Sequence, residues 1–254
     1  MLKKGSVAGK LDALLFIQDI ITSENQENKD FLEANAGLLL EALQVVLTLL
    51  LSRPSSQVPI KFLLYFLDVV HKLVTIKSFL KVKSIEKSLL KNLKGVSEES
   101  LQSFFEALFH NLLEQNEKSQ LDTKESPSIV RVLNSITLRL LENSDPNKTI
   151  ASLYALLSKY QKSLEDQRVI GLSLKCILKL ANAFRPLVST LKPDKILLEL
   201  HKFLLLQTEE SDELPIESVK IILQQLINLY GQRIQHHYSQ GVEKHPSKDK
   251  FLKE

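Results

Sequence analysis

The chain has 254 residues, of which 44% are hydrophobic and 25% are charged, a balance typical of globular proteins and too apolar for a disordered chain. Its formal net charge is only +3, so charge alone does not indicate nucleic acid or anionic lipid as a partner. A single cysteine excludes an intramolecular disulfide. Acids interrupt the apolar run near the N-terminus, and no apolar stretch reaches about 18 residues. We therefore expect a soluble, cytoplasmic chain with no signal peptide and no membrane span.

Helical periodicity recurs along most of the chain. Glycine and proline are few, strict alternation is hard to find, and leucine and lysine, which favour helices, are abundant. The sequence therefore predicts an all-α protein of about ten helices. In chain order they are 7–22, 29–51, 58–76, 78–93, 98–115, 128–142, 147–163, 167–184, 192–207 and 215–230.

Capping residues mark several of the predicted boundaries. Ser97, Ser126 and Asp145 precede predicted helices, where a side-chain oxygen can accept hydrogen bonds from free backbone N–H groups. Gly95 and Gly231 follow predicted helices, where glycine readily adopts the left-handed conformation.

Taken in pairs, the predicted helices repeat at roughly 40 to 47 residues, the period of HEAT-type helical hairpins. Such hairpins stack because no single pair buries its own apolar face. We expect one domain, 1–235, followed by a flexible polar tail, 236–254, which lacks apolar periodicity.

The strongest local charge feature is the predicted helix 78–93 and its flanks. Glu86 is the only acid among six lysines, which share an arc of roughly 160° opposite the apolar side chains. Either this is a solvated face without a partner, or it is attracted to an acidic surface, such as the acidic tails of tubulin or anionic lipid. The candidate contacts are Lys77, Lys81, Lys83, Lys87, Lys91 and Lys94.

Residues able to support catalysis or metal binding are scattered. The chain lacks a glycine-rich phosphate loop, a Cys-x-x-Cys pair and the zinc-protease and hydrolase motifs. Cys176 lies in an apolar helical pattern and is expected to be a small buried hydrophobe. His236, His237 and His245 fall in the predicted tail, where no preorganised metal site is expected. The sequence predicts neither an enzyme, nor a cofactor, nor a metal.

The stretch 191–206 combines two acids and a histidine with a dense apolar stripe. On a helical wheel the apolar residues share an arc of about 120°, and His201 stands at its edge. A histidine in that position is expected to be packed and hydrogen-bonded rather than a ligand. The stretch is therefore predicted to be a buried helix.

Three consecutive stretches, "SLKCILKLANAF", "LKPDKILLELHKFLL" and "LPIESVKIILQQLINLYG", follow one another in an order that resembles the C-terminal helical domain of the ch-TOG / mini spindles / MOR family of microtubule polymerases. Upstream, "SIVRVLNSITLRLLENSD" is also similar to the family, so the resemblance covers about 127 to 231. The positions that match its pattern are Lys175, Cys176, Ile177, Asp194, Lys195, Ile196, Leu197, His201, Phe203, Pro215, Val219, Lys220 and Gly231.

The resemblance implies a TOG-like stack of HEAT repeats in a fragment of a longer, microtubule-associated protein. It implies a monomeric domain at spindle poles, centrosomes and microtubule plus ends. In this family the C-terminal region serves partner docking more than direct polymerase action, and its partners are TACC-type coiled-coil proteins and SLAIN-type adaptors.

Direct tubulin binding is the alternative. Tubulin-binding TOG domains usually place a tryptophan in the first inter-helix loop, followed by a basic residue. This chain has no tryptophan; Val7 stands at the corresponding position, and Lys10 is the basic residue. Loss of an aromatic anchor weakens an interface, so docking of an adaptor is the preferred interpretation. The candidate loop contacts for tubulin are Lys10, Arg53, Lys124 and Arg168.

Overall fold

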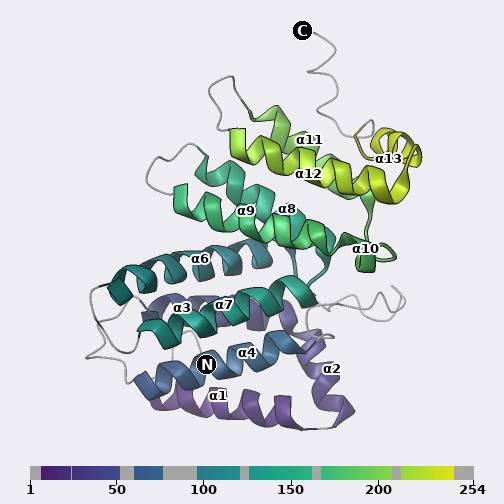
Figure 1. Ribbon diagram of the computed structural model, residues 1–254. Coiled ribbons are helices and arrows are strands. Elements are labelled where there is room, and N and C mark those ends of the chain that lie inside the picture. The colour runs from purple at the N-terminus through teal and green to yellow at the C-terminus, as the bar shows by residue number, and fades with distance from the viewer. Residues whose placement is uncertain are drawn as a thin grey trace. The chain divides into compact units, whose positions relative to one another are not determined.

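The structure is a computed structural model that describes residues 7–23, 25–51, 60–76, 96–120, 126–161, 167–207 and 213–242. The described residues form twelve α-helices and no strand. They divide into two compact units, Met1–Ser144 and Asp145–Glu254. Each unit is a stack of antiparallel helices (Figure 1), and this confirms the predicted all-α helical solenoid. Assignment of 1–235 to a single domain stays a prediction.

The first unit contains six described helices in two layers. α1 packs against α4, and α4 packs against α7, while α3 packs against α6 in the second layer. α6 and α7 also pack against each other, and α2 packs against α1. These helices are α1 (Val7–Thr22), α2 (Gln26–Ala34), α3 (Ala36–Leu51), α4 (Ile60–Thr75), α6 (Glu98–Gln120) and α7 (Ser126–Asn143).

The second unit repeats this arrangement with two hairpins. α8 packs against α9, α11 covers α8, and α12 covers α9, so one hairpin stacks on the other. α13 packs against both α11 and α12, beside the end of α12 (Figure 1). The helices are α8 (Pro146–Tyr160), α9 (Gln167–Asn182), α10 (Phe184–Leu187), α11 (Pro193–Leu205), α12 (Glu213–Tyr230) and α13 (Arg233–Val242).

Aromatic and branched aliphatic side chains fill the core of each unit. Phe66, Phe104 and Phe105 are fully buried in the first unit. In the second, the Tyr154 and Phe203 rings are tilted against each other, with centroids 5.0 Å apart. These contacts join helices far apart in the chain, which is how stacked hairpins obtain the burial that one pair lacks.

Several predicted caps are confirmed. The Ser97 hydroxyl accepts a hydrogen bond of 3.0 Å from the Ser100 backbone N–H, and an Asp145 carboxylate oxygen accepts one of 2.8 Å from the Asn147 backbone N–H. Gly231 follows α12 with a φ of +57°, and its N–H donates to the Ile227 carbonyl at 2.8 Å. Gly95 and the side chain of Ser126 lie outside the described residues.

The predicted helix 29–51 is two helices. The chain leaves the helical conformation at Asn35 (φ −110°, ψ 11°), and α2 and α3 are bent by 70° at this break. The Asn35 side chain donates to the Phe31 carbonyl at 2.9 Å, a local bond that competes with the helical ladder. Periodicity alone did not show this break, because apolar residues continue through it.

Two further boundaries differ from the predictions. The predicted helix 167–184 ends at Asn182, and a short α10 follows it. Residues 236–242, expected to begin a flexible tail, lie in α13. The described residues of α13 are mostly polar, so only packing against α11 and α12 reveals the helix; residues 243–254 lie outside the described part.

Candidate functional surfaces

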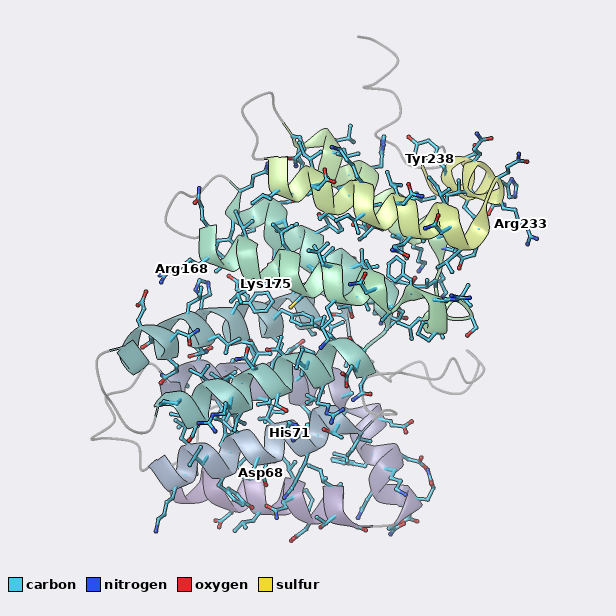
Figure 2. All side chains as sticks on the ribbon, in the orientation of Figure 1. Asp68, His71, Arg168, Lys175, Arg233 and Tyr238 are labelled. Carbon is cyan, nitrogen blue, oxygen red and sulfur yellow. The ribbon has the colours of Figure 1, made fainter. Side chains whose placement is uncertain are left out.

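Most of the predicted contact residues lie outside the described part of the chain. This holds for the six lysines between Lys77 and Lys94 and for Arg53 and Lys124. Lys10 lies in α1, but its side chain is not described. Arg168 is exposed in the first turn of α9 (Figure 2). The grouping of these residues therefore remains a prediction.

A basic face on α9 is a surface that the sequence reasoning missed. Lys175 and Lys179 are exposed and share one stripe of the helix with Arg168, because residues seven and four apart lie on one side of a helix. Val169, Ser173, Ile177 and Leu180 are buried on the opposite side. Neither α8 nor α9 contains an acid, and this absence was the available sequence signal. The stripe can attract an anionic surface through long-range charge.

His201 takes part in an aromatic cluster at the α11–α13 contact. The Tyr238 hydroxyl lies 3.4 Å from His201 Nδ1, and the two rings meet edge to face with centroids 6.1 Å apart. His237 contacts the Tyr230 ring of α12 in the same manner, at 5.5 Å. His201 is thus a packed, hydrogen-bonded histidine, as predicted, although its partner comes from the segment expected to be a tail.

Asn147 and Cys176 are buried groups of the second unit with structural roles. The Asn147 side chain donates to the Thr190 carbonyl at 3.0 Å and accepts from the Lys192 backbone N–H at 2.7 Å. It therefore ties the segment before α11 to the first turn of α8. Cys176 is buried as predicted, and burial raises its pKa from 9.0 to about 12 although nearby Lys179 opposes the shift. A thiol in this state is not a nucleophile.

The first unit likewise uses its polar side chains to connect helices. His71 Nε2 of α4 lies 2.9 Å from the Ser135 hydroxyl of α7, and the Asn143 side chain donates to the Val74 carbonyl at 2.9 Å. Ser100 of α6 donates to a Glu41 carboxylate oxygen of α3 at 3.1 Å. Each of these bonds joins two helices that pack against each other within one layer.

The described ranges contain neither a metal-binding cluster nor a single membrane-spanning helix. No group of three or more histidine, cysteine, aspartate or glutamate side chains is placed to hold a metal. No single helix there is long and apolar enough to cross a membrane; only α2 with most of α3 has the required length and composition, and that pair is bent by 70°. α3 buries Leu40, Leu43 and Leu47 inside the first unit.

Comparison with known proteins finds similar sequences, among them two plant proteins. Protein MOR1 of Arabidopsis thaliana is 26% identical over 164 residues, which are 57% of this chain and 8% of that protein. Protein MOR1 of Oryza sativa subsp. japonica is 25% identical over 134 residues, 45% of this chain and 7% of that protein. The chain thus spans less than a tenth of these relatives' length. No family model and no solved structure matches it. The similarity links the chain loosely to MOR proteins.

Proposed function

We propose that this chain is a TOG-like docking domain of a microtubule-associated protein of the MOR type. Its proposed place is the cytoskeleton, at spindle poles, centrosomes and microtubule plus ends. The observation that carries the proposal is the similarity to two plant MOR1 proteins, found in a chain whose described part is a stack of helical hairpins.

The residues that resemble the family support the docking role. Asp194, Ile196 and Phe203 belong to α11, and Val219 and Gly231 belong to α12 or its end. Ile196, Phe203 and Val219 are buried, so this part of the pattern specifies the stack rather than a catalytic site. A stack without a catalytic role presents its outer helix faces for binding. The proposed partners are TACC-type coiled-coil proteins or SLAIN-type adaptors.

Direct binding to tubulin or to the microtubule lattice is the second candidate. It is favoured by the exposed basic stripe of α9 and by the lysines of 77–94, whose placement is not described. Contacts of exposed lysines with acidic tubulin tails weaken with salt because screening acts over about 10 Å at 0.1 M. Docking of an apolar partner surface is much less sensitive to salt.

Microtubule co-sedimentation at low and moderate salt tests both candidates, with soluble tubulin followed in parallel. The docking proposal expects no salt-resistant binding to microtubules, together with binding to a purified TACC coiled coil or SLAIN segment. If the chain binds neither the TACC coiled coil nor the SLAIN segment, the docking proposal is wrong.

Two charge-reversed chains locate a lattice contact if one exists. One carries Lys83→Glu, Lys87→Glu and Lys91→Glu, and the other carries Lys175→Glu and Lys179→Glu. Binding that disappears in one of them and in added salt would assign the lattice contact to that helix. Lys195→Glu with Arg233→Glu is the matched control, because both residues are exposed cations on other helices of the second unit.

A further inference from the structure

α13 is attached to the second unit entirely through partly exposed side chains. Among its described side chains, residues 233–240, none is buried. By contrast, α11 buries five residues, including Leu200 and Phe203. Ile234 is the only aliphatic residue among the side chains 233–240, so α13 itself supplies little aliphatic surface to its attachment. A helix held in this way opens at a free-energy cost well below that of global unfolding.

The contacts between α13 and its neighbours include two edge-to-face ring contacts and one long hydrogen bond. Tyr238 meets His201 of α11, and His237 meets Tyr230 of α12. The Tyr238 hydroxyl is 3.4 Å from His201 Nδ1, and the Tyr238 side chain remains 44% exposed. Another helix with side chains of similar shape can make the same contacts in place of α13.

The surface of α11 that carries His201 is a stripe separate from its buried side. Leu198 and Leu205 stand three residues before and four residues after His201, and this spacing places all three on one face. Each is partly exposed, whereas Ile196, Leu197 and Leu200 are buried on the core side. Just beyond the stripe, Leu206 is 57% exposed. An apolar stripe with this spacing fits an amphipathic helix.

We infer that α13 is a detachable helix, and that the Leu198–His201–Leu205 stripe of α11 binds an amphipathic helix of a partner protein in its place. α13 shows what that partner requires: an aliphatic residue at the position of Ile234 and a tyrosine four residues later, whose hydroxyl reaches His201. The inference deepens the proposed docking role, on which it rests, by naming the surface and the helical form of the partner. Its test uses no microtubules and no known adaptor, so the two can fail separately.

The probe is the chain's own helix. A fluorescent peptide of residues 231–242 is made with a hydrocarbon staple in place of the His236 and Gln240 side chains, which are exposed and bond to each other at 2.8 Å. The staple is needed because isolated helices shorter than about 12 to 15 residues are marginal in water. Binding is followed by fluorescence anisotropy with the full chain, because truncation could unfold the unit.

The full chain is compared with Ile234→Ala/Tyr238→Ala, which loosens α13. Removing an occupant from its site raises the apparent affinity of a competitor by the inverse of the open fraction. We expect the loosened chain to bind the peptide at least about fivefold more tightly than the unaltered chain. Gln232→Ala/Gln235→Ala is the matched control, since both side chains are exposed, and it should behave as the unaltered chain. Equal affinity in all three chains would overturn the inference.

A second substitution locates the peptide. In the loosened chain, His201→Ala should weaken peptide binding several-fold, whereas Lys195→Ala, an exposed residue of the same helix, should not. Loss of binding in both, or in neither, would place the peptide elsewhere. Circular dichroism checks that each chain keeps its helical content.

Two further measurements test whether a second copy of the chain occupies the stripe of α11 and whether α13 detaches. If light scattering shows that the unaltered chain forms a dimer through exchange of α13, the stripe serves a second copy and the partner assignment is wrong. Hydrogen exchange should be faster in α13 than in α11 and α12. Exchange in α13 as slow as in α12 would contradict a detachable helix.

Discussion

The Tyr154 hydroxyl of α8 lies 3.1 Å from the Ser218 hydroxyl of α12, and both side chains are buried. Ser218 donates its one hydroxyl proton to the Pro215 carbonyl at 2.6 Å, so Tyr154 is the donor of the bond between them. Burial raises the pKa of Tyr154. This hydrogen bond connects α8 of one hairpin to α12 of the other.

Removing this donor should have a limited cost. Tyr154→Phe keeps the ring contact with Phe203 and leaves Ser218 bonded to Pro215, so we expect a loss of about 1 kcal/mol in the free energy of unfolding. Tyr154→Ala also removes the buried ring and should cost about 3 to 5 kcal/mol. Urea unfolding followed by circular dichroism measures both. Equal losses for the two variants would show that the hydrogen bond, not the ring, holds the hairpins together.

Asn147 should be difficult to replace. Its amide bonds both Thr190 and Lys192, so Asn147→Ala removes the partner of two part-buried backbone groups and should cost about 1 to 3 kcal/mol. Asn147→Asp should be worse than Asn147→Ala, because a carboxylate would face the Thr190 carbonyl and Asp145. Asn182→Ala, at an exposed position, is the control and should cost little. The melting temperature should be lowest for Asn147→Asp, higher for Asn147→Ala and highest for Asn182→Ala.

Alkaline pH should destabilise the protein through Cys176. The native state holds the thiol proton up to a pKa of about 12, whereas the ordinary value is 9.0. As the pH rises above 9, the unfolded thiol ionises first, so the unfolded state is favoured. This group should remove about 1 kcal/mol between pH 9 and 10.

Cys176→Ala provides the comparison, because alanine does not ionise. Its unfolding free energy, measured in urea at pH 8, 9 and 10, should fall less steeply with pH than that of the unaltered chain. Parallel curves would mean that the thiol is not protected by burial. In the native protein at pH 8 the thiol should also react slowly with an aromatic disulfide reagent.

Two glycines should respond in opposite directions to alanine. At Gly231 the φ is +57°, a conformation that costs an L-residue about 1 to 2 kcal/mol, so Gly231→Ala should destabilise by that amount. At Gly171, inside α9, a methyl group meets nothing within 4 Å, and Gly171→Ala should stabilise by about 0.5 to 1 kcal/mol. Neither site has a steric clash, so the contrast isolates backbone conformation. The melting temperature measured by calorimetry should fall for Gly231→Ala and rise for Gly171→Ala.

Sequence periodicity and local chemistry determined much of the fold. The apolar spacing predicted the helices that became α1, α4, α6, α8, α11 and α12, and Ser97, Asp145 and Gly231 marked helix ends because their hydrogen bonds reach only a few residues along the chain. The expected burial of Cys176 and of the 191–206 stretch followed from the same period of the helix.

Tertiary structure decided the features that depend on residues far apart in the chain. α13 contains residues that lack apolar periodicity, and it packs on α11 through contacts that include Tyr238 with His201. The Tyr154–Ser218 bond joins residues 64 positions apart. The basic stripe of α9 also needed the structure, since only burial of the opposite side shows that Lys175 and Lys179 face outward. A helix forms from bonds between near neighbours, so its sequence reveals it. Which faces meet, and which remain available, depends on how separate helices fit together.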